Sequence, residues 1–345
     1  LIGTYTLELS KEGYARESGE ITIEEGKVLP VNIEMCSGRE LTLQTDREGD
    51  ILYVDGKRVG VSPQKLELSY GIHTIRAERG EQHTEKQLEV TETGGERVVT
   101  LGFGLLSGIR WSSSVTPKQK EILSRLVENM VQVEGGRFQM GGTPEQGSDA
   151  NDWEKPVHEV TLSDYYMGKY EVRQSEWEAV MGNNPSYFKG DDLPVEQVSW
   201  EDCHEFIGRL NALTGLSFKL PTEAQWEYAA RGGNLSKGYK FSGSNDLEEV
   251  GWYGSNSGNY THRVGEKQPN ELGLYDMSGN VWEWCEDKYG EYNITSQSDP
   301  LGAAKGSQWV YRGGCWCFEA SYCRVSFRAH DPGNRYYSVG LRLVL

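Results

Sequence analysis

The first hundred residues repeat a pattern of short alternating strands. A Gly-Thr-Tyr-Thr-Leu-Glu-Leu run begins at Gly3, and a Gly-Ile-His-Thr-Ile-Arg-Ala run begins at Gly71. Each is followed by a charged turn and a second strand-like run, at 28–35 and at 97–101. Apolar and polar residues alternate with the period of half-buried strands. The two copies start about 68 residues apart, and a repeat of this length predicts tandem β modules.

The second module, residues 37–102, contains a strand, an Asp-Gly turn and a return strand. Its motifs are Leu-Tyr-Val-Asp-Gly at 52–56, Val-Gly-Val-Ser-Pro at 59–63 and Gly-Ile-His-Thr-Ile at 71–75. In these motifs it resembles the PEGA domain, a small β-sandwich of bacterial surface proteins, and residues 1–36 form a partial copy. Of the four residues that name that family, only Glu48 and Gly49 agree here. The resemblance implies a spacer or adhesion role.

Residues 103–128 are expected to form a linker and a short helix that packs the two parts together. Thr116 has the residue type of an N-cap, and Pro117 suits the first helical position. The apolar residues that follow share one helical face. They are Ile122, Leu123, Leu126 and Val127.

Charge and composition exclude several classes of protein. The net charge is −17, which argues against nucleic-acid binding, since phosphates are bound by clustered Lys and Arg. No apolar run of about 18 residues is present, so we expect no membrane-spanning segment. The ten Trp and nineteen Tyr require a large core or a binding face. Because the chain begins with Leu1 and shows no signal peptide, we expect it to be a processed or truncated piece of a longer protein.

The C-terminal part, residues 129–345, carries a series of blocks in a fixed order. The blocks are Gly-Gly-Arg-Phe-Gln-Met-Gly at 135–141, Pro-Val-His-Glu-Val at 156–160, Tyr-Glu-Val at 170–172, Leu-Pro-Thr-Glu-Ala-Gln-Trp-Glu-Tyr-Ala-Ala-Arg-Gly-Gly at 220–233, Gly-Leu-Tyr-Asp-Met-Ser-Gly-Asn-Val-Trp-Glu-Trp at 273–284, Arg-Gly-Gly at 312–314, Cys-Arg at 323–324 and Gly-Leu-Arg at 340–342. In these blocks the chain resembles the formylglycine-generating enzyme (sulfatase-modifying factor) family. That resemblance implies an irregular α+β fold related to C-type lectins, with long loops around a small twisted sheet.

A helix is predicted after Ser199, which caps it, with Glu201 and Asp202 in its first turn. The apolar residues that follow recur at helical spacing, so we expect Cys203 to be a small core residue. The other members of this face are Phe206, Ile207 and Leu210.

The cysteines depart from the pattern of the active enzymes. Those enzymes use two cysteines, separated by four residues, to bind copper(I) and convert a substrate cysteine to formylglycine with oxygen. Here Cys323 takes the second position and Phe318 takes the first, which predicts a non-catalytic protein. If the segment is extended, Cys317 should point to the opposite face. A bulge would instead allow a copper pair of Cys317 and Cys323.

Two further roles for the cysteines remain open, one implied by the resemblance and one suggested by the Cys-x-Cys spacing of Cys315 and Cys317. Relatives without the oxidase pair keep cysteines at the positions of Cys285 and Cys323, which implies a core role and possible disulfide. The alternative is a zinc site, for which soft thiolates are suitable ligands. It would join Cys285, Cys315, Cys317 and Cys323.

The 273–284 block also implies a calcium ion. Carried over from the family, the ligands are the side chains of Asp276 and Glu283 and the backbone carbonyls of Gly279 and Val281. Such hard oxygen ligands are the ones that calcium prefers. The alternative is a loop held by the packing of Asn280 and Trp282 without metal. The lone histidines show no metal-ligand spacing, so we expect them to be structural. They are His158, His204, His262 and His330.

Two functions remain open. The first is a non-catalytic binding or scaffold protein outside the bacterial cytoplasm, in the periplasm or on the cell surface. In this interpretation, PEGA-like spacers present a lectin-like domain to a protein or glycan ligand. The second is a copper-dependent oxidase that converts a substrate cysteine to formylglycine.

Overall fold

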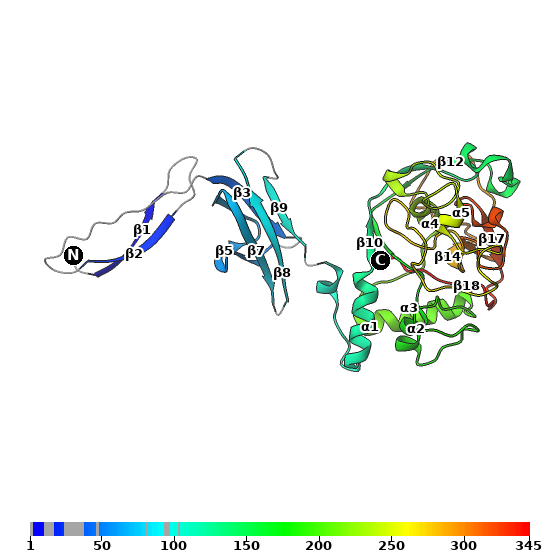
Figure 1. The fold of residues 1–345 in the computed structure, drawn as a ribbon, viewed down its shortest axis with the longest axis horizontal. Helices are drawn as coiled ribbons and strands as arrows, with labels where there is room; N and C mark the ends of the chain where they lie inside the picture. The colour runs from blue at the N-terminus through cyan, green and yellow to red at the C-terminus, as the bar shows by residue number, and fades with distance from the viewer. Residues whose placement is uncertain are drawn as a thin grey trace. The chain divides into compact units, whose positions relative to one another are not determined.

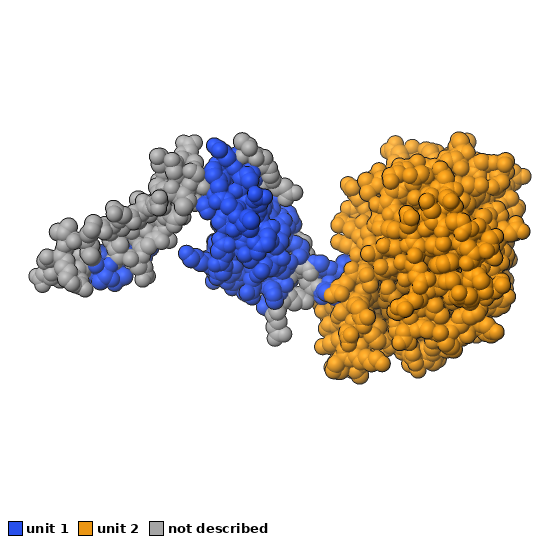
Figure 2. Space-filling model, viewed as in Figure 1, with its two compact units in different colours: residues 1–107 blue, residues 108–345 orange. Residues whose placement is uncertain are grey.

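The chain forms two compact units, Leu1–Ser107 and Gly108–Leu345 (Figure 2). The computed structural model describes residues 3–9, 17–23, 38–45, 48–80, 82–92, 97–102 and 104–345. The strand-like run expected at 28–35 and Arg47 of the PEGA-like motif lie outside these residues. Among the described residues, no helix has both the length and the apolar character that crossing a membrane would require.

The first repeat contributes an antiparallel hairpin. Strand β1, Gly3–Leu9, pairs with β2, Glu17–Ile23, and Tyr5 lies opposite Ile21. The alternation expected around Tyr5 therefore does form a strand.

The second repeat forms two sheets around one hydrophobic cluster, and its alternating residues form strands as predicted. Leu41 and Leu43 of one sheet join Leu52 and Ile75 of the other in this cluster. The Asp-Gly turn joins β4 to β5, and Asp55 and Gly56 both adopt positive φ, which suits a tight hairpin turn. One sheet has the order β6 (Gln64–Ser69), β3 (Gly38–Thr45), β9 (Val98–Leu101), and the other has the order β5 (Lys57–Val61), β4 (Ile51–Val54), β7 (Gly71–Arg79), β8 (Gln82–Val90).

Helix α1, Pro117–Glu128, begins as the sequence predicts. The Thr116 side chain accepts a hydrogen bond from the backbone N–H of Gln119, and Pro117 occupies the first turn. Leu123, Leu126 and Val127 are buried, and the Gln119 side chain donates to the carbonyl of Ala179. The helix thus belongs to the C-terminal unit, which begins at Gly108, whereas the sequence assigned 103–128 to a junction.

Helices α1, α2 and α3 lie side by side along one side of the C-terminal unit (Figure 1). The rings of Trp177 in α2 and Phe206 in α3 stack with centroids 4.9 Å apart. Ser199 and Asp202 form the predicted cap of α3, and Cys203 is fully buried, which confirms its core role. The helices are α2 (Gln174–Met181), α3 (Trp200–Thr214), α4 (Glu223–Ala230) and the single turn α5 (Leu247–Val250), with 3₁₀ turns η1 (Leu105–Gly108), η2 (Pro144–Asp149), η3 (Asp152–Glu154), η4 (Gly233–Leu235) and η5 (Ala320–Cys323).

Three small sheets complete this unit, which is therefore a mixed α+β fold with long loops. Its main apolar cluster includes Trp226 of α4, Val160 of β12 and Val310 of β16. The sheets are β10 (Met130–Val133) with β13 (Tyr165–Gly168); β11 (Gly136–Met140), β12 (His158–Leu162) and β15 (Gln297–Ser298); and, in spatial order, β17 (Arg328–Asp331), β16 (Trp309–Arg312), β14 (Trp282–Lys288) and β18 (Val339–Gly340).

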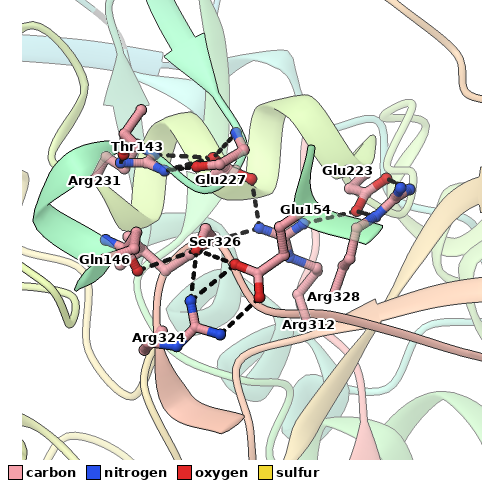
Figure 3. A network of polar contacts seen from close by, with 12 residues as sticks. Thr143, Gln146, Glu154, Glu223, Glu227, Arg231, Arg312, Arg324, Ser326 and Arg328 are labelled. Atoms are coloured by element: carbon pink, nitrogen blue, oxygen red, sulfur yellow. Dashed lines mark hydrogen bonds and ion pairs between the residues drawn. The ribbon is translucent and has the colours of Figure 1, made fainter. Parts of the chain in front are cut away.

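Buried ion pairs cross the interior between helix α4 and the last sheet (Figure 3). The Glu223 carboxylate accepts hydrogen bonds from Arg312, at 2.7 Å, and from Arg328, at 2.5 Å and 2.7 Å. Arg312 also donates to Glu227 at 2.6 Å, and Glu227 in turn binds Arg231. Burial acts to raise the pKa of Glu223, but the charges of Arg328 and Arg312 outweigh it and lower that pKa.

A second buried pair joins the beginning of this unit to its end. Glu154 in η3 accepts 2.6 Å and 2.8 Å hydrogen bonds from Arg324, and Ser326 donates to the same carboxylate. Gln146 lies next to Ser326 and accepts from its hydroxyl (Figure 3). The two partners stand 170 positions apart in the sequence.

We predict that Glu223→Gln lowers the free energy of unfolding of the C-terminal unit by about 3–5 kcal/mol, because it leaves buried guanidinium charge without compensation. The change should be visible as an earlier loss of native tryptophan fluorescence in heat or urea. All ten tryptophans lie at position 111 or later, so this signal reports on the C-terminal unit alone.

Glu205→Gln is the matched control. Glu205 also pairs with an arginine, Arg209, at 2.6 Å, but both side chains are about half exposed. Exposed pairs contribute less than about 1 kcal/mol. Equal losses of stability in the two variants would contradict a structural role for the buried pair.

Candidate functional site

The loop expected to bind calcium folds closely against the backbone of Trp252. Gly279 has φ of 102°, and a Cβ at this position would lie 2.3 Å from the Trp252 carbonyl oxygen. The N–H of Gly279 donates to the carbonyl of Gly313, and the N–H of Asn280 donates to that of Trp252, each at 2.8 Å. Only glycine fits this approach without displacing the backbone.

Asn280 is fully buried and ties three segments together. Its side-chain amide donates to Glu171, at 2.7 Å, and to the carbonyl of His262, while its side-chain oxygen accepts from the N–H of His262. Glu171 also accepts from the N–H of Val281 at 3.0 Å. These contacts support the interpretation that protein groups hold the loop.

Three buried carboxylates gather at this loop around one guanidinium. They belong to Glu171, Asp276 and Glu283, and the guanidinium is that of Arg342. Burial raises the pKa of Asp276 to about 6. Burial, together with the charges of Asp276 and Glu283, raises the pKa of Glu171 well above its usual value. The site therefore holds more acidic groups than the single arginine neutralises.

The predicted ligands Asp276 and Glu283 both lie in this cluster, but their carboxylates have different hydrogen-bond partners. Glu283 accepts hydrogen bonds from Arg342, at 2.6 Å and 2.9 Å, and from the Trp226 indole at 2.7 Å. Asp276 accepts from the N–H of Gly265 at 2.7 Å, while its Oδ1 is buried without a partner. Asp276 Oδ1 is thus open to a further partner, whereas Glu283 is held by protein donors. Over the described part of the chain, no group of three or more His, Cys, Asp or Glu is arranged to hold a metal ion.

Three of the cysteines lie together. The Sγ atoms of Cys315 and Cys317 are 3.2 Å apart, and the backbone N–H of Cys315 donates to the thiol of Cys323. Burial raises the pKa of the Cys323 thiol to about 12. Gly314 has φ of 76°, and a Cβ there would lie 2.5 Å from the Cys323 sulfur, so glycine leaves room for that thiol.

The segment around Cys317 is a turn and not an extended strand. The N–H of Phe318 donates to the carbonyl of Cys315 at 3.2 Å. The argument from alternating faces therefore does not apply, and Cys317 contacts the thiol of Cys315, two positions earlier. Phe318, which stands at the first copper position, is 40% exposed, and its ring packs on Trp282 and Tyr322.

Cys285 and Cys323 are both free in the structure. Cys285 packs in the main apolar cluster with Trp226 and Val310, whereas Cys323 packs in a separate cluster with Phe241 and Leu247. The expected disulfide stays a prediction that this packing does not support. The packing does not support the four-cysteine zinc site either, because Cys285 and Cys323 lie in different apolar clusters.

A group of aromatic rings lies beside the cysteine turn. We define the aromatic face as Tyr187, Phe188, Trp316 and Tyr337. Tyr187 is 69% exposed and Tyr337 is 49% exposed, and their ring centroids are 6.3 Å apart. Trp316 packs between Tyr337, at 5.7 Å, and Phe188, at 5.4 Å. Aromatic residues, Tyr and Trp among them, are enriched at protein interfaces.

Glu196 supports the loop that carries Tyr187. It is fully buried, its Oε1 accepts from the N–H of Phe188 at 2.8 Å, and its own N–H donates to Ser186. Burial raises the pKa of Glu196 to about 7. A buried carboxylic acid thus holds the backbone of the loop that carries the exposed Tyr187 ring.

Sequence reasoning missed several of these groups. Glu171 and Arg342 stand in the recognised blocks at 170–172 and 340–342, but their pairing with the 273–284 loop is visible only in the fold. Glu196 and the aromatic face lie in loops without periodicity, so no pattern marked them. Each histidine considered earlier packs against an aromatic ring: His158 on Tyr292, His204 on Trp200, His262 on Trp252 and His330 on Tyr289.

Comparison with known families gives a match over most of the chain. Residues 115–345 match the family described as sulfatase-modifying factor enzyme 1-like domain. Among solved structures, the chain is similar to Treponema denticola variable protein 1, with a TM-score of 0.56 and 36% identity, over 62% of this chain and 94% of that one.

Curated relatives differ in their described roles. The chain is 36% identical over 233 residues to the chaperone protein LppX of Paenibacillus barcinonensis, covering 53% of this chain and 79% of that protein. It is 28% identical over 293 residues to the formylglycine-generating enzyme of Thermomonospora curvata, covering 63% of this chain and 93% of that enzyme. Against the serine/threonine-protein kinase pkn1 of Chlamydia pneumoniae, the match spans 38% of the kinase.

Proposed function

Because the chain belongs to the sulfatase-modifying factor enzyme 1-like family, we propose that its C-terminal domain is a non-catalytic binding or scaffold domain. The observation that carries this proposal is Phe318, a side chain without metal-binding atoms at the first copper position. The thiol that contacts Cys317 is that of Cys315, not that of Cys323. Copper(I) chemistry needs two soft thiolates directed at one ion. A copper oxidase is therefore the weaker interpretation.

We predict that the protein does not convert cysteine to formylglycine. The full chain, loaded with copper(I) and supplied with oxygen, would be incubated with a sulfatase-type cysteine peptide and followed by mass spectrometry. The formylglycine-generating enzyme of Thermomonospora curvata provides the positive control. Phe318→Cys is the informative variant, because it restores a thiol at the first position. Conversion by the wild-type chain at a rate comparable to that control would overturn the proposal.

The same proposal assigns the ligand to the aromatic face. Tyrosine and tryptophan supply large contact area with few rotatable bonds, and they are enriched at the centres of protein interfaces. The name of the relative LppX, a chaperone protein, also favours a protein ligand over a glycan. The ligand we propose is accordingly a protein that covers Tyr187 and Tyr337.

We expect the double variant Tyr187→Ala, Tyr337→Ala to bind such a ligand at least about tenfold more weakly, since a buried aromatic anchor contributes about 2 kcal/mol or more. The ligand would be identified by crosslinking to the wild-type chain, and its affinity measured by biolayer interferometry. Trp153→Ala, which removes an exposed ring from another segment, should leave affinity unchanged. Unaltered affinity in the double variant would show that the ligand binds another part of the surface. If the wild-type chain bound specific glycans on an array and the double variant did not, the ligand of the aromatic face would be a glycan.

Calcium is part of the proposal as a structural ion. Its support is the unpartnered Oδ1 of Asp276 and the surplus of buried acids over Arg342. The ligands that the family resemblance names are Asp276, Glu283 and the carbonyls of Gly279 and Val281, and of these Glu283 would have to exchange bonds to Arg342 and Trp226 for the ion. When bound, it would neutralise negative charge where the chain enters β14.

We predict that calcium raises the melting temperature relative to a chelator, because an ion that binds only the native state stabilises it, by about 2.7 kcal/mol at a hundred times its dissociation constant. Asp276→Ala, which removes both side-chain oxygens, should abolish the difference. Asp152→Ala, at an almost fully exposed carboxylate, should retain it. Identical melting curves of the wild-type chain in calcium and in chelator would show that the loop needs no ion.

In the proposed architecture, the N-terminal unit is a PEGA-like β-sandwich spacer. The C-terminal domain has a C-type-lectin-like fold. We place the protein outside the cytoplasm of a bacterium, in the periplasm or at the cell surface. The support is the resemblance of 37–102 to a domain of bacterial surface proteins. Fractionation of cells that express the native protein tests this, and recovery in the cytoplasm alone would contradict it.

A further inference from the structure

Two thiols meet across one turn of the C-terminal unit. Cys315 and Cys317 are the first and third residues of the turn closed by the Phe318 N–H, and their Sγ atoms are 3.2 Å apart. This distance is longer than a sulfur–sulfur bond of about 2.05 Å. It is shorter than the separation of about 3.8 Å expected for two thiolates that share a tetrahedral ion at about 2.3 Å each. A movement of about 1 Å would join the sulfurs.

The turn is anchored on several sides, which keeps the two thiols facing each other. The N–H of Trp316 donates to the carbonyl of Asn280 at 2.8 Å, and its carbonyl accepts from the Ser257 hydroxyl at 2.7 Å. The carbonyl of Phe318 accepts from the N–H of Gly254 at 2.8 Å. The chain between and after the cysteines is therefore fixed by neighbours from other loops.

We propose that Cys315 and Cys317 form a reversible dithiol–disulfide redox site, which exchanges with low-molecular-weight disulfides of the glutathione type. This site is distinct from the expected Cys285–Cys323 pair and does not depend on the proposed binding function.

Access decides which cysteine reacts first. Cys317 is partly exposed, whereas Cys315 and Cys323 are fully buried. The hydrogen bond from Cys315 lowers the pKa of Cys317, whereas burial raises the pKa of Cys203 and of Cys285 well above the usual value. Thiolate character and exposure together control cysteine reactivity. Cys317 is therefore the attacking thiol, and Cys315 is the resolving thiol.

The exchange balances in two steps. The Cys317 thiolate attacks one sulfur of the small disulfide, a mixed disulfide forms, and one thiolate leaves. Cys315 then loses its proton to water and attacks the Cys317 sulfur, which expels the second thiolate. Overall, the two cysteines lose two electrons and two protons, and one small disulfide becomes two small thiols.

The test equilibrates the full chain with reduced and oxidised glutathione, blocks free thiols with an alkylating reagent and maps the peptides by mass spectrometry. We expect one peptide in which Cys315 and Cys317 are both unalkylated and about 2 Da lighter. Dithiothreitol should reverse the change. Peptide mapping, not intact mass, is needed because Cys36 lies outside the residues that the structure describes.

Variants separate the two roles. Cys315→Ser should accumulate the glutathione adduct on Cys317, because no resolving thiol remains. Cys317→Ser should leave Cys315 unmodified, and Cys203→Ala, which removes a buried cysteine of α3, should behave as the wild type. Native tryptophan fluorescence is used to check that each variant is folded. If a variant is not folded, the peptide map of the wild-type chain alone tests whether Cys315 and Cys317 form a disulfide.

Two results would overturn the proposal. One is complete alkylation of Cys315 and Cys317 in the wild-type chain at equilibrium with excess oxidised glutathione. The other is a disulfide that joins either of them to Cys285 or Cys323.

Discussion

Buried guanidinium–carboxylate pairs determine how the C-terminal unit holds its shape. Its sheets are small and its loops are long, so side-chain contacts between distant segments add to the backbone hydrogen bonds that fix the loops. Glu223 joins helix α4 to strands β16 and β17 through Arg312 and Arg328. An ion pair in a low-dielectric interior tolerates little misalignment, because each unpaired charge is costly. We expect the pairs to specify which segments of the unit meet, as well as to hold those segments together.

The candidate site depends on the same kind of contact. Arg342 binds Glu283 and also donates to the carbonyls of Gly168 and Tyr275, so one side chain aligns three segments at the 273–284 loop. In this loop, the carbonyl of Asn280 accepts a hydrogen bond from the N–H of Trp316. Trp316 belongs both to the cysteine turn and to the aromatic face. The acid cluster, the thiols and the exposed rings are therefore parts of one connected structure.

Local chemistry made much of the fold predictable. The caps at Thr116 and Ser199, the buried Cys203 and the Asp55–Gly56 turn all follow from residues that act on near neighbours in the sequence. The contact of Cys315 with Cys317 could not be predicted, because no sequence pattern distinguished a turn there from an extended segment. The engagement of Glu283 by Arg342 joins residues 59 positions apart, and spacing alone says nothing about such a pair.

The pairing of Glu154 with Arg324 has a consequence for how this unit is made. The carboxylate is synthesised 170 residues before its partner guanidinium, so during translation it has no native counter-ion until almost the whole unit has emerged. Contacts of such high sequence separation slow folding, since a long loop must close before they contribute stability. The unit is therefore expected to fold after its synthesis is nearly complete, whereas the β module that precedes it can fold while the ribosome is still at work.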